Sequence, residues 1–320
     1  MLILLTFYII CDINIITKSI NLWGFYEKEN LGIFILLISY VISIIIGIVS
    51  FNILEEYINN IYLKIFIADV VATIIIWIIG NIFKTASVYD PYWSVQTVVI
   101  SIALIINKGQ LSLGTIIYLI PVILWAIRLT YNFIKTFNDL SYIDWRYKML
   151  KEKTKFFYPV VNLLGIHLVP TIIVFLASMP LFYYIVNDLS FNYLSVIGVI
   201  IMIIAVGFEY IADNNMHKFI KTRKSRSEIN RTGIWKYSRH PNYFGEILFW
   251  YGMAVYLILP NINLWYFILG AILNNALFLF ISIPMAEKKM MQYKDNFLEY
   301  KKEIRMLIPI KKRVKIDGRS

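Results

Sequence analysis

Long apolar stretches separated by short polar segments dominate the pattern along the chain. A helix needs roughly 17–25 mainly apolar residues to cross a hydrocarbon core of about 30 Å. Stretches that reach or approach this length lie at 32–51, 66–82, 93–107, 114–134, 160–186, 193–212, 243–259 and 264–283. The pattern predicts a bundle of transmembrane helices, in which the short 93–107 stretch is tilted or partly re-entrant.

A further apolar stretch, residues 2–16, is interrupted by Asp12. It lacks the positively charged start and the small-residue cleavage site of a signal peptide. The sequence leaves open whether this stretch crosses the membrane, so the prediction is seven to nine helices. Because no repeat and no linker divides the chain, we expect one integral membrane domain over residues 1–320.

Composition supports an all-α polytopic membrane protein. The chain has 320 residues, of which 59% are hydrophobic and 16% charged, whereas soluble domains are about one quarter charged. The single cysteine, Cys11, excludes an internal disulfide and a cysteine-based zinc site. Three histidines are too few for a membrane di-iron enzyme, and we expect no metal site.

The net charge of +11 is distributed unevenly. Of the 31 Lys and Arg residues, 25 lie within 135–160, 213–242 and 285–320, whereas the loops 187–192 and 260–263 contain none. The positive-inside rule then predicts that the three basic stretches face the cytoplasm. The tail 311–320 is expected there too, with membrane lipids as its partners. We expect no nucleic-acid role and no obligate protein partner.

Polar residues gather near the predicted cytoplasmic end, most densely just before and inside the 243–259 stretch. Arg239 and His240 precede a helix that begins at Pro241. Backbone N–H groups and the helix dipole favour an anion at such a place. Glu246 lies about one turn inside the span, where a carboxylate is costly unless it is paired or functional. A structural pair with Arg239, seven residues away, is the alternative.

Three other polar groups lie at the same end. Glu209 and Asp213 are four residues apart and share one helix face. Arg128 is the only arginine inside a predicted span, so it faces the bundle or extends to the membrane surface. Asp90 and Tyr92 place a carboxylate and a phenol at the mouth of the 93–107 stretch. No G-x-G motif occurs, so a nucleotide cofactor would be held by side chains of the helices.

Together these residues resemble those of the steroid 5-alpha-reductase-like membrane proteins, and more narrowly a bacterial-type branch of that family. The likeness covers roughly residues 65–310 and is densest over Tyr237–Glu246. Its other motifs are Asp90-x-x-Trp93-Ser94, Trp125-x-x-Arg128-Leu129, Asp144-x-Arg146-Tyr147, Glu209 with Asp213, Pro284-x-x-Glu287, Tyr300 and Ile308-Pro309. The Arg-His-Pro-x-Tyr core is also similar to isoprenylcysteine and phospholipid methyltransferases, but Glu246 favours the reductase-like group.

The resemblance implies about seven core helices around NADPH, and reduction of a lipophilic enone that enters from the bilayer. The cofactor-binding residues that it implies are Arg128, Asp213, Arg239, His240, Asn242, Tyr243, Glu246, Glu287 and Tyr293. In this hypothesis Asn242 and Glu246 hold the carboxamide, while Arg239 meets the phosphates with Lys221 and Arg223. Asp90 and Tyr92 are the catalytic candidates that act on the carbonyl oxygen of the substrate.

Two alternatives remain open. In a methyltransferase, Arg239 and His240 would bind the carboxylate of S-adenosylmethionine and Glu287 its amino group. Glu246 and the group around Asp90 favour reduction, because methyl transfer needs no acid beside a carbonyl. A transporter or lipid-binding protein would place charges near the bilayer midplane and break its helices there, whereas the charges of this chain lie near one face.

Overall fold

The computed structural model describes residues 28–137 and 139–312, and this part of the chain is helical almost throughout. In chain order the segments are α2 (Lys28–Leu54), α3 (Ile61–Ile82), η1 (Ala86–Tyr89), α4 (Tyr92–Lys108), α5 (Leu113–Ile134), α6 (Trp145–Thr154), η2 (Lys155–Phe157), α7 (Tyr158–Val161), η3 (Asn162–Leu168), α8 (Val169–Val186), α9 (Ser195–Thr222), η4 (Gly233–Lys236), α10 (Pro241–Ile258), η5 (Ile262–Phe267), α11 (Ile268–Leu277), η6 (Phe278–Ser282), α12 (Ile283–Tyr293) and α13 (Phe297–Glu303). Over these residues no strand forms, apart from one isolated bridge between Ser238 and Arg305. The all-α prediction is confirmed.

Within the described ranges, seven helical segments are long and apolar enough to cross a membrane. All eight predicted stretches are helical. The one that is not among these seven segments, 243–259, forms α10, which packs against α8, α9 and α11. The 93–107 stretch belongs to α4, which runs unbroken for 17 residues. The 2–16 stretch lies outside the described residues.

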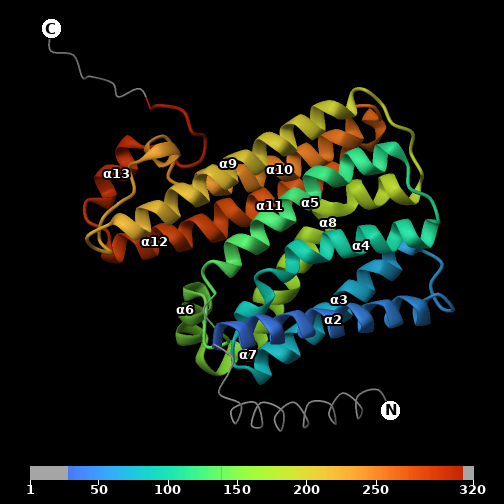
Figure 1. The fold of residues 1–320 in the computed structure, drawn as a ribbon, viewed down its shortest axis with the longest axis horizontal. Coiled ribbons are helices and arrows are strands. Elements are labelled where there is room, and N and C mark those ends of the chain that lie inside the picture. The colour runs from blue at the N-terminus through green and yellow to red at the C-terminus, as the bar shows by residue number, and fades with distance from the viewer. Residues whose placement is uncertain (1–27, 138, 313–320) are drawn as a thin grey trace.

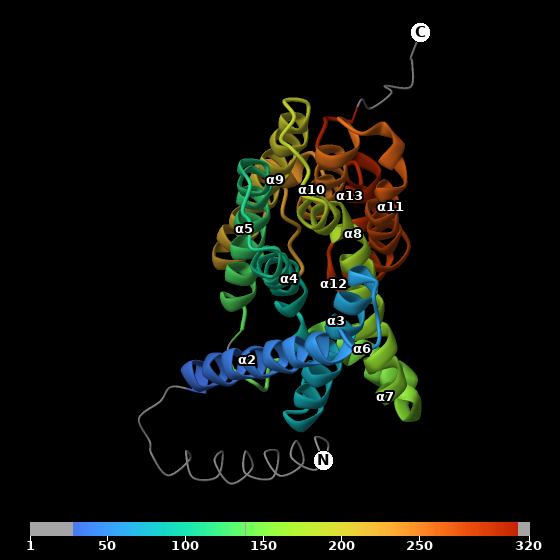
Figure 2. The same cartoon turned by 90° about the vertical axis from the view of Figure 1, so that its right-hand side faces the viewer.

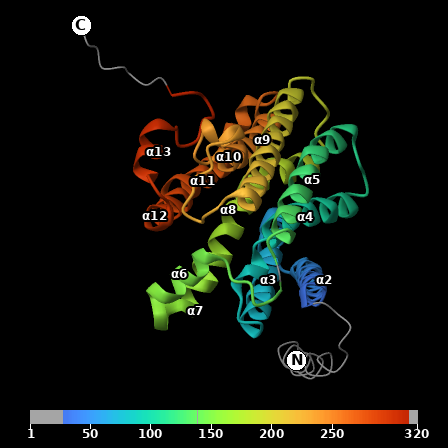
Figure 3. The same ribbon diagram turned by 60° about the vertical axis from the view of Figure 1, so that its left-hand side comes forward.

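The helices form a bundle with two edges. In all three views α2 and α3 lie at one edge and α9 and α10 at the other, with α4, α5 and α8 between them (Figures 1, 2 and 3). The tightest pairing is that of α9 with α10, where glycines allow a close approach. A Cβ atom on Gly198 would stand 2.5 Å from the backbone nitrogen of Tyr256.

The two ends of the bundle differ in charge. The connections from α2 to α3, from α4 to α5 and from α8 to α9 lie at one end, while α6 and α13 lie at the other (Figure 1). The described parts of the basic stretches, 135–137, 139–160, 213–242 and 285–312, belong to the second end, which is called the basic end below. Local signals set the turns at the opposite end: Asn60 and Ser112 cap α3 and α5, and Gly109 closes α4 at φ 69°.

Aromatic side chains fill the core between these helices. Trp125 stacks on Phe249 at 4.8 Å between ring centroids and meets Trp250 edge-on at 5.1 Å. Tyr118 stacks on Tyr256 at 3.8 Å, nearer to the opposite end. All five rings are fully buried. Large rings in edge-on and stacked contact fix the spacing of α5 and α10, and so hold the polar residues on these two helices in position.

Candidate functional site

Arg128 on α5 is the centre of a buried cluster of charges. Its Nη1 lies 3.0 Å from Asp213 Oδ2, its Nη2 lies 3.3 Å from Glu246 Oε2, and Nη2 also pairs with Glu209. The side chains of Arg128 and Asp213 are each 11% exposed, and Glu209 is fully buried. Three carboxyl groups therefore surround one guanidinium, which leaves the cluster with an excess of acceptor oxygens. We call these four residues the Arg128 cluster.

Two indoles also hold Glu246 in place. Trp125 Nε1 donates to the two carboxylate oxygens of Glu246 at 3.2 and 3.1 Å, and Trp250 Nε1 donates to Oε1 at 2.9 Å. Hydrogen bonds to an ionised acceptor in a water-poor interior are among the stronger ones. The carboxylate that the sequence placed one turn inside the span is therefore both paired and oriented.

The Arg128 cluster connects to the basic end through Asp213 and its neighbours. Asn242, at the start of α10, hydrogen-bonds to the side chain of Asp213. The turn η4 is fixed beside the same part of α9, because Trp235 Nε1 donates to the carbonyl of Ala212 at 2.9 Å and Ile234 N donates to Asn215 Oδ1 at 3.2 Å. Four predicted cofactor residues, Arg128, Asp213, Asn242 and Glu246, thus lie in one group.

Arg239 and His240 belong to a second group, centred on Glu287 of α12. Arg239 Nε donates to Glu287 Oε1 at 2.8 Å, His240 Nε2 lies 3.3 Å from the same oxygen, and Lys301 Nζ lies 2.7 Å from Oε2. Arg239 Nη1 donates to the carbonyls of Lys301, at 3.1 Å, and Ile304. We call Arg239, His240, Glu287 and Lys301 the Glu287 cluster.

The Glu287 cluster corrects the expectation of an open anion site before α10. The side chains of Arg239 and His240 are only 6% and 5% exposed, and the donors of Arg239 are used inside the protein. Burial lowers the pKa of His240, which favours the neutral imidazole. The alternative pair of Arg239 with Glu246 does not form either, since each has another partner. The group ties the start of α10 to α12 and to the segment around α13.

The two predicted tyrosines of the cofactor set lie in different places. Tyr243 stacks on the ring of His240, with 5.4 Å between centroids and 6° between the planes, and so extends the Glu287 cluster. Tyr293, the last residue of α12, is 42% exposed, and Lys294 Nζ lies 5.2 Å from the centroid of its ring. The structure brings Tyr293 into neither cluster.

Asp90 and Tyr92 do not form the pair that the sequence suggested. Asp90 accepts a hydrogen bond from the hydroxyl of Tyr147 and lies 3.6 Å from Arg146 Nη2. Tyr92 turns the other way, and its hydroxyl donates to Asp69 Oδ1 on α3 at 3.3 Å. The two side chains diverge because residues two apart at a helix start lie about 200° apart around the axis.

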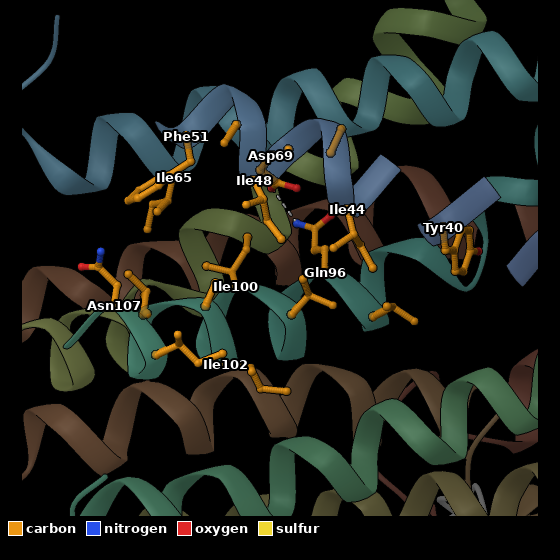
Figure 4. A pocket seen from close by; sticks show the side chains of 18 of the residues that line it. Tyr40, Ile44, Ile48, Phe51, Ile65, Asp69, Gln96, Ile100, Ile102 and Asn107 are labelled. Atoms are coloured by element: carbon orange, nitrogen blue, oxygen red, sulfur yellow. Dashed lines mark hydrogen bonds between the residues drawn. The ribbon is translucent and has the colours of Figure 1, made fainter. Parts of the chain in front are cut away.

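Asp69 lies on the wall of a cavity of about 440 Å³ between α2, α3 and α4. Figure 4 shows Asp69 and Gln96 facing one another, with isoleucines of α2, α3 and α4 around them. Gln96 Nε2 donates a hydrogen bond of 3.0 Å to Asp69 Oδ2. Gln96 Oε1 is buried and takes no hydrogen bond from the described residues. Ile48, Ile102 and Ile106 also line the cavity and are 48%, 47% and 74% exposed, so it opens toward the surface that faces lipid.

Sequence reasoning missed Asp69 and Gln96 as site residues, although a signal was present. Asp69 is a lone carboxylate inside the predicted 66–82 span, and charged groups at such depth are rare and usually functional. A chain of contacts joins the cavity to the Arg128 cluster: Trp93, next to Tyr92, meets Trp125 edge-on at 5.5 Å, and Trp125 donates to Glu246.

Over residues 28–137 and 139–312, no group of three or more His, Cys, Asp and Glu side chains is arranged to hold a metal ion. The acidic members of the Arg128 cluster are instead paired with one arginine.

Comparison with known proteins identifies the family. Residues 76–304 match a family described as a protein of unknown function, DUF1295. No curated protein and no solved structure matches the chain. The match lies inside the predicted 65–310 core and includes both clusters and Tyr92, whereas Asp69 precedes it. The chain therefore belongs to the DUF1295 family, which is the steroid 5-alpha-reductase-like family of membrane proteins.

Proposed function

We propose that this protein is a membrane-embedded, NADPH-dependent reductase that acts on a carbon–carbon double bond conjugated to a carbonyl in a lipophilic molecule. The observation that carries the proposal is the hydrogen-bonded pair of Asp69 and Tyr92 on the wall of an apolar cavity that opens toward lipid. A cavity of this volume is within the range of small-molecule sites.

The pair on the cavity wall suits a carbonyl oxygen. The hydroxyl of Tyr92 and the carboxyl of Asp69 together can donate a hydrogen bond to that oxygen and supply a proton. The apolar lining from α2 and α4 excludes water, which strengthens this polarisation. Asp69 replaces Asp90 as the acid in this proposal, because Asp90 is engaged by Arg146 and Tyr147 outside the cavity.

The Arg128 cluster fits the nicotinamide end of the cofactor. The three carboxyl groups of the cluster offer six oxygens to one guanidinium, and Arg128 Nε is buried with no hydrogen-bond acceptor within the described part of the chain. Carboxamide N–H groups and ribose hydroxyls are donors that such surplus acceptors would bind. Asn242, Asp213 and Glu246 would orient the ring, while Lys221 and Arg223 at the end of α9 would meet the phosphates. When bound, NADPH supplies the hydride for the β-carbon of the enone.

The methyltransferase alternative has less support. It requires Arg239 and His240 to bind a carboxylate and Glu287 to bind an amino group. These three side chains bind one another and are almost fully buried. Binding S-adenosylmethionine there would first break ion pairs that join α10 to α12, and leaving a buried charge unpaired is costly.

Cofactor binding to the detergent-purified protein is the first test. We expect NADPH to raise the midpoint of thermal unfolding, whereas S-adenosylmethionine and S-adenosylhomocysteine leave it unchanged. A ligand at a hundredfold excess over its Kd stabilises by about 2.7 kcal/mol. Glu246→Gln should remove the NADPH effect, and Glu55→Gln, a change at a 62% exposed carboxylate that pairs with Lys64 outside both clusters, should keep it. Stabilisation by the adenosyl compounds alone would overturn the reductase.

Turnover with a panel of lipophilic enones is the second test, followed as loss of NADPH absorbance. Asp69→Asn and Tyr92→Phe should lower kcat by about 10²–10⁴-fold, the usual contribution of a general acid, and should retain stabilisation by NADPH. Asp90→Asn is the matched comparison, and we expect it to affect turnover less. Equal rates in all three variants would remove the α2–α3–α4 cavity from the mechanism.

A further inference from the structure

A second, smaller cavity of about 180 Å³ lies at the basic end, between the end of α3, α6 and α7. Three lysines line it, Lys84 from the turn after α3 and Lys148 and Lys151 from α6. None of the three is within 4.0 Å of a carboxylate in residues 28–137 and 139–312. Three cations thus converge on one hollow without a carboxylate in ion-pair contact, which favours an anion there.

The position of Lys84 is imposed by the backbone. Lys84 has φ 58°, in the left-handed region that glycine adopts freely and other residues rarely do. The turn is held by hydrogen bonds from Lys84 N to Asn81 O at 3.2 Å and from Thr85 N to Gly80 O at 2.9 Å. A strained conformation at a site-lining residue is a reason to look for a function.

The lining of the cavity also contains an acceptor without a donor. Asn162 is 4% exposed, and its Nδ2 donates to Asn81 Oδ1 at 3.3 Å. Asn81 Nδ2 in turn donates to the carbonyl of Trp77 at 2.8 Å, which fixes the orientation of both amides. Asn162 Oδ1 is left buried without a donor among the described residues. A buried acceptor of this kind needs a hydrogen-bond donor from a ligand or from water.

The surroundings of the cavity place it at the membrane surface. Next to it, Phe156 and Phe157 are 88% and 67% exposed, and aromatic side chains at this level are typical of the membrane–water interface. Val160 and Leu164 continue the exposed apolar surface along α7 and η3, at 55% and 50% exposure. The helix is widened to a π-helix from Asn162 to Leu168, a distortion that is frequent at functional sites.

We propose that this cavity binds a phosphate ester that carries a hydroxyl group, as in the headgroup of a polyol phospholipid of the adjoining leaflet. The lysines bind the phosphate, and Asn162 Oδ1 accepts a hydrogen bond from the hydroxyl. The acyl chains of a lipid would lie along Phe157, Val160 and Leu164. The same headgroup chemistry is available in a soluble ester such as glycerol phosphate, so the two sources are separated by experiment. The site is independent of the proposed reduction.

The test measures binding of short-chain lipids to the purified full-length chain by native mass spectrometry. Phosphatidylglycerol and phosphatidylmethanol carry the same charge, but only the first has headgroup hydroxyls. We expect phosphatidylglycerol to bind about threefold to tenfold more tightly, the range of one net hydrogen bond, and Asn162→Ala to abolish that preference. Equal affinity of the two lipids for the unaltered chain would overturn the role of Asn162.

Charge is tested with two triple variants that remove the same number of lysines. Lys84→Gln, Lys148→Gln and Lys151→Gln together should weaken phosphatidylglycerol binding at least about tenfold. Lys135→Gln, Lys153→Gln and Lys155→Gln, which lie outside the cavity lining, should change it little. Equal losses in both variants would show a general charge effect and overturn the site. Competition by glycerol phosphate at similar concentration would identify a soluble ester as the ligand, and failure to compete would identify the lipid.

Discussion

Arg128 is the residue on which three helices of the bundle depend. It pairs with Glu209 and Asp213 of α9 and with Glu246 of α10 while lying on α5. Taking these groups out of water costs several kcal/mol per ion, and the planar guanidinium offsets this cost because its donors reach all three carboxylates. A lysine would present one point charge and could not reproduce the same arrangement. Arg128 therefore has a structural role in addition to the proposed cofactor site.

Removing the guanidinium should destabilise the protein strongly. Arg128→Gln leaves three buried carboxylates without a cation, and breaking a buried pair costs about 3–5 kcal/mol. Arg231→Gln is the matched control, since its partner Glu303 is 49% exposed, and surface pairs contribute about 0–1 kcal/mol. Thermal unfolding in detergent, compared between the two variants, measures the difference. Similar losses of stability would show that the carboxylates of the cluster do not require Arg128.

His240 predicts a dependence of stability on pH. Burial lowers its pKa, and the charged groups that face it are Arg239, Glu287 and Lys301. The unfolded chain binds a proton near pH 6.5, whereas the folded chain takes it up only at lower pH. The contribution of neutral His240 to the free energy of unfolding is therefore complete above about pH 6.5, and it declines as the pH falls below that value. As the pH is lowered from about 8 to about 5, the midpoint of thermal unfolding should fall less in His240→Gln than in the unaltered protein. Identical pH profiles of the two proteins would exclude His240 as the titrating group.

At the scale of elements, close packing of α9 and α10 brings Glu209 next to Glu246. A Cβ on Gly245 would lie 2.5 Å from Glu209 Cγ and 2.8 Å from Ala205 O, and one on Gly252 would lie 2.9 Å from Ile201 Cγ2. Small residues at such positions let helix backbones approach in membrane proteins. The short distance between the two helices allows one arginine of α5 to reach carboxylates on both.

Alanine substitutions separate this packing role from helix propensity. Gly245→Ala and Gly252→Ala should each lower stability by about 1–3 kcal/mol, the cost of overpacking, and Gly245→Ala should also weaken NADPH binding by displacing Glu209. Gly207→Ala lies in α9 too, but nothing is within 4 Å of its added Cβ. We expect it to stabilise the helix by up to about 1 kcal/mol. The midpoints of thermal unfolding of the three variants test this difference. Equal changes in stability at all three glycines would contradict the packing argument.

The elements were predictable from the sequence to a greater extent than their contacts. Eight apolar stretches marked eight helical regions, because length and hydropathy are local properties. The sequence marks Arg128 and Glu246 as costly charges and Asp213 as an implied cofactor residue, and the structure brings the three together. The partners of Arg239 and Tyr92 were not predictable, because Glu287 and Asp69 are 48 and 23 residues away along the chain. Such pairings depend on how the helices pack.

For the whole molecule, the separation of charge between the two ends sets the orientation in the membrane. The connections at the opposite end include 187–192 and 260–263, which contain no lysine or arginine, while the basic end contains α6, η4 and α13. Both clusters and the lysine-lined cavity lie toward residues of the basic end. If this end faces the cytoplasm, NADPH and the lipids of the inner leaflet reach their proposed sites from the same side.

Cysteine accessibility tests that orientation. In a Cys11→Ser background, Lys224→Cys introduces a thiol in the exposed segment after α9, and Asn261→Cys introduces one between α10 and η5 at the opposite end. We expect a membrane-impermeant maleimide to label Asn261→Cys in intact cells, and Lys224→Cys only after permeabilisation, because the positive-inside rule retains the basic end in the cytoplasm. Labelling of Lys224→Cys in intact cells would invert the bundle. It would also place the Arg128 cluster where cytoplasmic NADPH cannot enter, and so would count against the proposed reductase as well as against the topology.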